Sequence, residues 1–175
     1  RGILFGETYA DAAKEKILGN YEASEKLFQK ALDINPNSAP AHYELGNIYS
    51  IQEKPQLALE QYEMAVKSDK SNYWFHLSYG TALRDLGQSE KAIEEFTALI
   101  AKEPKRIELK YELAQLLLNN DKKEEGLEVI NQIEEELGVT KEVSFLKQRV
   151  HLSNNEVDAA AAEIQKLIDT YPNEI

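Results

Sequence analysis

A repeat with a period of 34 is the feature that most constrains this chain. A proline follows an apolar helical run at Pro36, Pro104 and Pro172, and successive members of this set are two periods apart. Blocks of this length that begin at positions 5, 39, 73, 107 and 141 align without any insertion. We number the positions within a block as columns, with column 1 at the start of the block. A fixed period of this length predicts an array of repeated supersecondary units.

Columns 8 and 20 carry small residues, with Gln148 as the one exception, and predict a close crossing of two helices. Each block contains two stretches with apolar residues at helical spacing, separated by turn residues such as Gly19 and Asn20, so each block should form an antiparallel helix hairpin. Glycine inside a helix costs about 1 kcal/mol relative to alanine. Gly46 and Gly80 nevertheless occupy column 8. We therefore expect the two helix backbones to approach closely there, beside a bulky residue in column 24. Column 8 contains Ala12, Gly46, Gly80, Ala114 and Gln148; column 20 contains Ser24, Ala58, Ala92, Gly126 and Ala160; column 24 contains Phe28, Tyr62, Phe96, Ile130 and Ile164.

These columns resemble the tetratricopeptide repeat (TPR) family, whose repeat unit has the same period and carries Leu, Gly and Tyr in columns 7, 8 and 11, Ala in 20, an aromatic residue in 24, Ala in 27 and Pro in 32. The resemblance covers essentially the whole chain, and it implies an all-α, TPR-type α-solenoid, a right-handed superhelix of antiparallel helix hairpins. The matching residues are Leu45, Gly46, Tyr49, Ala58, Tyr62 and Ala65 in the second block, Gly80, Ala92, Phe96 and Pro104 in the third, and Ser24, Phe28, Ala31 and Pro36 in the first.

The predicted domain organisation follows the blocks. A leading segment (1–4) precedes five repeats, and the chain begins without methionine, so we expect it to be a piece of a longer repeat protein. The first helix of the last block departs from the family pattern and is expected to be degenerate. The spacing of Val143, Leu146 and Val150 suggests that this helix is rotated by about one residue. The five predicted repeats span residues 5–38, 39–72, 73–106, 107–140 and 141–174.

The family resemblance implies that the first helices line a concave groove that holds another protein. The groove columns of the family are 2, 5, 9, 12 and 13, and column 5 is here apolar and mostly aromatic. We therefore predict a protein-protein interaction scaffold that binds a peptide or protein segment of unknown identity. Aromatic residues in column 5 can instead pack between adjacent first helices, and Trp74 can cover the preceding hairpin, so both interpretations stay open. The predicted groove residues are Tyr9, Tyr43, Asn47, Trp74, Leu77, Thr81, Arg84, Tyr111, Gln115 and Phe145.

One known groove chemistry of the family does not fit. TPR receptors for chaperone tails use a carboxylate clamp of lysine, asparagine and arginine at fixed columns in three successive blocks. In blocks two to four those places hold Tyr43, Asn47, Ser78, Glu108 and Glu112, of which only Asn47 fits. The neighbouring windows also fail, so we predict that the chain is not a carboxylate-clamp receptor.

Composition excludes several other classes of function. The net charge of −11 would repel nucleic acid and anionic lipid, and no apolar run approaches the length needed for membrane insertion. The chain has no cysteine, and we find no phosphate loop or hydrolase motif. His42 and His76 share column 4, but helices pack about 8–10 Å apart, too far for one zinc ion, so we interpret them as packing residues. We expect no enzyme activity, no catalytic residues, no cofactor and no metal. Localisation stays open between the cytoplasm and the bacterial periplasm or envelope.

The last predicted helix leaves apolar residues without an obvious cover. Ile164, Leu167 and Ile168 lie on that helix, and repeat arrays need polar ends for solubility. Two explanations compete. Either further repeats follow in the natural protein, or the last hairpin pairs with another copy of itself and makes the chain a self-association or assembly module, a homo-oligomer.

Overall fold

A computed structural model describes residues 2–174, and these residues form an all-helical array. The predicted all-α class is therefore confirmed. Within residues 2–174, no helix is both long and apolar enough to cross a membrane. The ten helices of this range are α1 (Gly2–Ile17), α2 (Tyr21–Ile34), α3 (Ala39–Ile51), α4 (Pro55–Ser68), α5 (Tyr73–Asp85), α6 (Ser89–Lys102), α7 (Ile107–Asn119), α8 (Lys123–Leu137), α9 (Lys141–Ser153) and α10 (Val157–Thr170).

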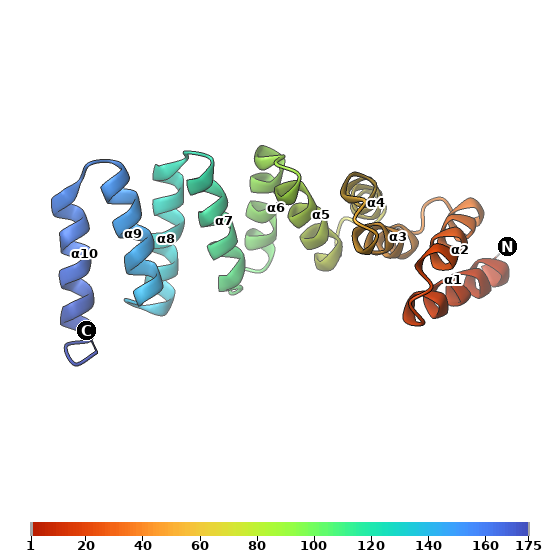
Figure 1. Ribbon diagram of the computed structural model, residues 1–175, viewed down its shortest axis with the longest axis horizontal. Coiled ribbons are helices and arrows are strands. Elements are labelled where there is room, and N and C mark those ends of the chain that lie inside the picture. Colours follow the sequence, from red (N-terminus) through yellow and green to blue (C-terminus); the bar gives the residue numbers. More distant parts are fainter. Residues whose placement is uncertain (1, 175) are drawn as a thin grey trace. The chain divides into compact units, whose positions relative to one another are not determined.

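The chain divides into two compact units within α6. The first unit ends at Glu95 and the second begins at Phe96. In the first unit α1 packs on α2, α2 on α3, α3 on α4 and α4 on α5. In the second unit α7, α8, α9 and α10 pack in the same sequential manner, and Figure 1 shows these four helices side by side. Within each unit, these helices thus contact their neighbours in the sequence.

The helix boundaries repeat with the sequence period because capping and turn residues recur. The even-numbered helices begin at residues 21, 55, 89, 123 and 157. Column 34 supplies side-chain caps before three odd-numbered helices: Ser38 accepts from the Ala41 N–H, Asn72 from Trp74 and Phe75, and Thr140 from Val143. Such caps satisfy N–H groups that have no partner within the helix. Column 15, in the turn between the two helices of each hairpin, has a left-handed backbone in every block, at Gly19, Glu53, Gly87, Asp121 and Asn155.

The predicted close crossing of the paired helices is present. The Ser24 hydroxyl in column 20 donates a 2.7 Å hydrogen bond to the carbonyl oxygen of Ala12 in column 8. A Cβ atom built on Gly126 would lie 3.6 Å from the carbonyl oxygen of Ala114. At Gly46, the nearest atom to an added Cβ is Cε1 of the Tyr62 ring, at 2.7 Å. The ring in column 24, rather than the side chain in column 20, therefore sets the limit at Gly46.

The predicted rotation of the first helix in the last block is wrong. In α9 the buried residues occupy columns 3, 4, 7 and 10, and the same columns are buried in α7. Leu146 is only half-buried. The register is kept because Lys147, in the column that holds leucine in α3 and α7, lies beside two carboxylates that neutralise it. The four buried residues of α9 are Val143, Ser144, Lys147 and Val150.

The last helix is partly as expected. Ile164 and Ile168 are 46% and 36% exposed, as the sequence predicts, but Leu167 is buried at 5%. Leu167 lies in column 27, which is buried in every block. Within residues 2–174, the exposed apolar side chains of α10 therefore include Ile164 and Ile168 but not Leu167.

Candidate protein-binding groove

A hollow in the second unit brings three of the predicted groove residues together. Its volume is about 330 Å³, and its wall combines two aromatic rings, one aliphatic side chain, one amide and two charged groups from α7 and α9. It includes the column 5 and column 9 positions of two successive first helices, where the predicted ligand face lies. The lining residues are Tyr111, Gln115, Glu142, Phe145, Leu146 and Arg149.

A second hollow shares Arg149 with the first. It also measures about 330 Å³ and reaches toward the C-terminal ends of α7 and α9. We call the two hollows together the α7–α9 groove. The residues that line the second hollow are Leu118, Asn119, Lys123, Arg149, Val150 and Ser153.

The α7–α9 groove combines an exposed aromatic ring with several charged side chains. The Phe145 side chain is 60% exposed, whereas Tyr111 is half-buried against the core of the second unit. Arg149 and Glu142 are exposed, and neither makes a hydrogen bond or ion pair with any residue in the range 2–174. Lys123 is engaged, with its Nζ atom 3.6 Å from an Asp121 carboxylate oxygen. Two charged groups of the groove are therefore available to a ligand.

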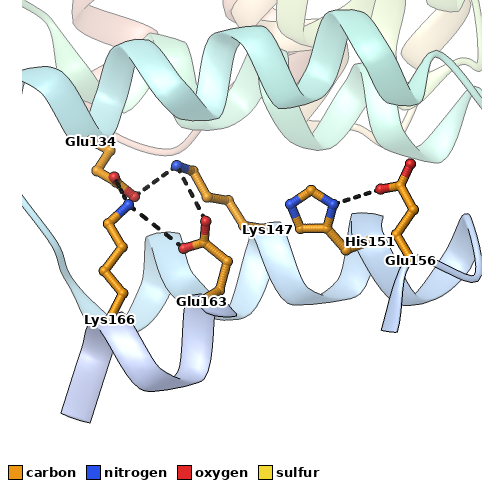
Figure 2. Close-up of polar contacts among 6 residues, drawn as sticks. All are labelled: Glu134, Lys147, His151, Glu156, Glu163 and Lys166. Atoms are coloured by element: carbon orange, nitrogen blue, oxygen red, sulfur yellow. Dashed lines mark hydrogen bonds and ion pairs between the residues drawn. The ribbon is translucent and has the colours of Figure 1, made fainter. Parts of the chain in front are cut away.

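A buried group of charges holds α9 in place behind the groove. The Lys147 Nζ atom lies 2.8 Å from Oε2 of Glu134 on α8 and 3.8 Å from Oε1 of Glu163 on α10, and Lys166 contacts both carboxylates (Figure 2). We call these four residues the charge quartet. The side chains of Lys147, Glu134 and Glu163 are only 8%, 15% and 14% exposed. The charge quartet thus joins α8, α9 and α10.

The charge quartet shifts the pKa values of two of its members. Burial raises the pKa of Glu134, but hydrogen bonds from Lys147 and Lys166 outweigh this effect, and the net result is a lowered pKa. The hydrogen bond to Glu134 raises the pKa of Lys166, although burial opposes it. Both shifts favour the charged forms of Glu134 and Lys166.

In the first unit, two predicted groove residues contribute to packing. The Tyr9 ring packs edge-on against Phe28 with centroids 5.4 Å apart, and the Tyr43 ring lies 4.9 Å from Phe75. Both tyrosines are half-buried. Packing between helices, the alternative left open by the sequence, therefore accounts for a large part of these two side chains.

Asn47 is tied to the same core. Its side-chain oxygen accepts a 2.9 Å hydrogen bond from the hydroxyl of Tyr62. Burial, followed by the proximity of Tyr43 and Glu44, raises the pKa of Tyr62 to about 12, against a weaker lowering by Ser50. The Tyr62 hydroxyl thus stays protonated and keeps donating to Asn47.

The remaining predicted residues of the first unit lie on α5 and differ in exposure. Trp74 is 56% exposed, and its ring contacts Tyr73 edge-on at 5.1 Å. Leu77 and Thr81 are half-buried, and the Arg84 guanidinium pairs with Asp85 at 2.9 Å. A hollow of about 1000 Å³ in this unit lies elsewhere, and none of the predicted residues lines it. Its wall contains Gly19, Asn20, Tyr21, Glu22, Ala23, Glu25, Lys26, Gln29, Gln52 and Lys54.

The two column 4 histidines have the packing role inferred from the sequence. His42 contacts Gln61 at 2.8 Å through Nδ1 and the Pro36 carbonyl oxygen at 2.9 Å through Nε2. His76 makes the equivalent pair of contacts one period later, with Glu95 and the carbonyl oxygen of Lys70. Each histidine therefore joins the two helices of its own hairpin to the end of the preceding one.

Three residues of the first hollow were not among those predicted: Glu142, Leu146 and Arg149. None of the five residues that only the second hollow adds was predicted either. Glu142 and Arg149 occupy columns 2 and 9, which belong to the family's groove, so the column pattern alone could have found them. Leu146 was instead assigned to the core by the supposed rotation of α9.

Comparisons with known proteins identify the repeats. Tetratricopeptide repeat models match residues 15–38, 27–60 and 83–149. The type IV pilus assembly protein PilF of Pseudomonas aeruginosa is 36% identical over 76 residues, which are 43% of this chain. The chain spans only 30% of the length of that relative.

Solved structures share the fold. YrrB, a TPR protein, superposes with a TM-score of 0.76 at 20% identity over 95% of this chain and 86% of its own. MamA gives 0.79 at 16% identity over 100% and 98% of the two chains. A TPR protein from Parabacteroides merdae gives 0.75 at 18% identity over 97% and 68%. Together with the sequence columns and the repeated helix hairpins, these matches show that the chain is an α-solenoid protein of the tetratricopeptide repeat family.

Proposed function

We propose that this chain is an interaction scaffold that binds a peptide or protein segment in the groove lined by first helices, with the α7–α9 groove as a principal contact. The observation that carries the proposal is the 60% exposure of Phe145 in the wall of a hollow. A large aromatic ring exposed in a concave site gains free energy when a ligand covers it, and aromatic residues are enriched at interface hot spots. Gln115 supplies an amide in the same wall for hydrogen bonds to a peptide backbone.

The relatives support the same kind of ligand. The YrrB structure is described as that of a TPR protein with an unusual peptide-binding site, and PilF is a pilus assembly protein. A partner in an envelope-associated assembly is therefore a reasonable starting point for experiments. In the first unit, Trp74 is the most exposed large apolar side chain among the predicted residues and offers a second place for contact.

The introduction of negative charges into the groove tests this proposal. The double variant Tyr111→Glu/Phe145→Glu should lose a bound partner by at least about tenfold in affinity, because it removes both aromatic contacts and places two charges against the ligand. Partners are captured from the lysate of the source organism, identified by mass spectrometry, and titrated against wild type and variant. Circular dichroism must show equal helicity.

The matched control carries the same two charges outside the groove. Leu57→Glu/Leu137→Glu alters leucines on second helices that are 41% and 50% exposed, and it should bind like the wild type. If the groove variant and the control bind the partner equally well, the groove is not the binding site.

A second candidate function, self-association through α10, is favoured by one observation. Ile164 occupies column 24, which is buried in each earlier block but 46% exposed here. Ile168 lies one turn further on the same helix and is also exposed. A second copy that pairs its α10 with this face would bury both side chains. In the earlier blocks, the exposed fraction of the side chain in this column is 0% for Phe28, 6% for Tyr62, 1% for Phe96 and 0% for Ile130.

Substitution on α10 separates the two candidates. If α10 self-associates, the wild type should sediment faster at high concentration, and Ile164→Asp/Ile168→Asp should sediment as a monomer with unchanged helicity. Ile130→Asp makes the same change at a buried column 24 position and should unfold the second unit, at a cost of about 3 kcal/mol or more. A wild-type protein that sediments as a monomer at both low and high concentration excludes self-association.

A further inference from the structure

We infer that the α7–α9 groove selects an extended peptide segment in which a basic, an apolar and an acidic side chain occupy alternate positions. This inference rests on the proposed function and specifies the class of ligand. Three residues of the groove carry it: Arg149 for the acidic side chain, Phe145 for the apolar one and Glu142 for the basic one.

Arg149 is the recognition element for a carboxylate. It lies where the two hollows of the groove meet, its side chain is exposed, and it has no hydrogen-bond or ion-pair partner within residues 2–174. The chain has 31 acidic and 20 basic residues, so an arginine that faces a groove without a carboxylate partner is unexpected. Arginine binds a carboxylate through two parallel hydrogen bonds, and this geometry adds selectivity for carboxylates to the electrostatic attraction.

Phe145 and Tyr111 form the apolar centre. Phe145 lies four residues before Arg149 on α9, so the two side chains are one helical turn apart on the same face. Tyr111 and Leu146 complete the wall around the exposed ring. An apolar side chain of the ligand that enters this hollow would contact these apolar residues.

Glu142 is the recognition element for a basic side chain. It lies in the first turn of α9, and it too has no hydrogen-bond or ion-pair partner within residues 2–174. A carboxylate in the first turn of a helix interacts favourably with the helix dipole, and this would explain why an acidic residue lies here. The dipole does not explain why Glu142 also lines the hollow. A lysine or arginine of the ligand would neutralise it.

The spacing fits an extended chain. Glu142 and Arg149 are seven residues apart on one helix, which corresponds to about 10.5 Å along the axis. In an extended peptide, side chains that point to the same face are two residues apart, so three successive ones span about 13 Å. Flexible glutamate and arginine side chains cover the remaining difference. The expected motif is basic-x-apolar-x-acidic, in either chain direction.

The test is a selection from a display library of random dodecapeptides on the immobilised full chain. The wild type should enrich the motif. Arg149→Glu should replace the acidic position by a basic one, and Glu142→Arg should replace the basic position by an acidic one. Lys91→Glu, an exposed site on α6 with the same change in charge as Arg149→Glu, should keep the wild-type motif. All variants must show wild-type helicity.

Binding measurements give the magnitude. A synthetic peptide from the wild-type selection should bind Arg149→Gln at least about tenfold more weakly, because a charge-assisted hydrogen bond is lost. Added salt should weaken wild-type binding more than binding to this variant, since salt screens the exposed charge pair.

The possible failures are distinguishable. Peptides that bind with an apolar residue but without acidic enrichment, or an unchanged acidic preference in Arg149→Glu, overturn the inference and leave the proposed function in place. If neither the wild type nor any charge variant enriches a peptide, the proposed peptide-binding groove fails, and the inference fails with it.

Discussion

Gly46→Leu is expected to destabilise the first unit by about 3 kcal/mol or more, the upper end of the usual range for overpacking a core. Gly46 is buried in α3, and even an added Cβ atom would lie 2.7 Å from the ring of Tyr62. The larger leucine side chain would push that ring away from its hydrogen bond to Asn47 and separate α3 from α4. Urea unfolding followed by circular dichroism measures the loss.

Gly6→Leu is the matched control because Gly6 is also in a helix but an added Cβ would meet no atom within 4 Å. This variant should be neutral or stabilising by up to about 1 kcal/mol, since leucine favours helix more than glycine does. Tyr62→Ala in the Gly46→Leu background should recover part of the lost stability. Equal unfolding midpoints for the two leucine variants would show that the close approach at Gly46 is absent.

Lys147→Met is expected to destabilise the second unit by about 3 kcal/mol, because removal of one partner leaves an uncompensated buried charge. Glu134 and Glu163 would keep only Lys166, which is 40% exposed and therefore the weaker partner. Replacing Glu134 and Lys147 together with leucine should cost less than Lys147→Met alone. Lys141→Met, whose exposed partner Glu174 lies 3.8 Å away, is the control and should change stability by less than about 0.5 kcal/mol. A Lys147→Met variant as stable as this control contradicts the prediction.

The same substitution should alter the dependence of stability on pH. The folded-state pKa of Glu134 is lowered, so its contribution is present above the unfolded-state pKa, about 4.3, and is lost as pH falls through the lower folded-state value. In Lys147→Met the pKa of Glu134 should rise, and the acid loss should begin at a higher pH. Unfolding midpoints measured between neutral and acid pH report this shift, and parallel curves for the two proteins would exclude it.

The repeat architecture could be predicted because each local signal agrees with the others. The period fixes the hairpins, the small residues of columns 8 and 20 fix the crossing, and column 34 supplies caps such as Ser38 and Asn72. In a repeat array a residue contacts mainly its own and the adjacent hairpin, so one-dimensional patterns contain most of the fold.

The misjudged details depend on pairs of residues that lie on different helices. The spacing of Val143, Leu146 and Val150 indicated a rotated helix. The helix instead keeps its register because Lys147 has partners on the helices before and after its own, Glu134 on α8 and Glu163 on α10. Single-column analysis cannot show such compensation. The same limit applies to the candidate site, since column 5 alone did not distinguish the packed Tyr9 and Tyr43 from the exposed Phe145.

The mainly sequential packing of the helices has a kinetic consequence. Within each unit, the helix pairs with the most extensive contacts are adjacent in the chain, and the turn inside each hairpin contains one left-handed residue in column 15. Most native contacts therefore form once short loops have closed, so the entropic cost of the folding transition state is low and folding should be rapid. Local opening can then involve one hairpin rather than a whole unit. Amide hydrogen exchange should therefore resolve several separate opening events, one for each hairpin, instead of a single global one.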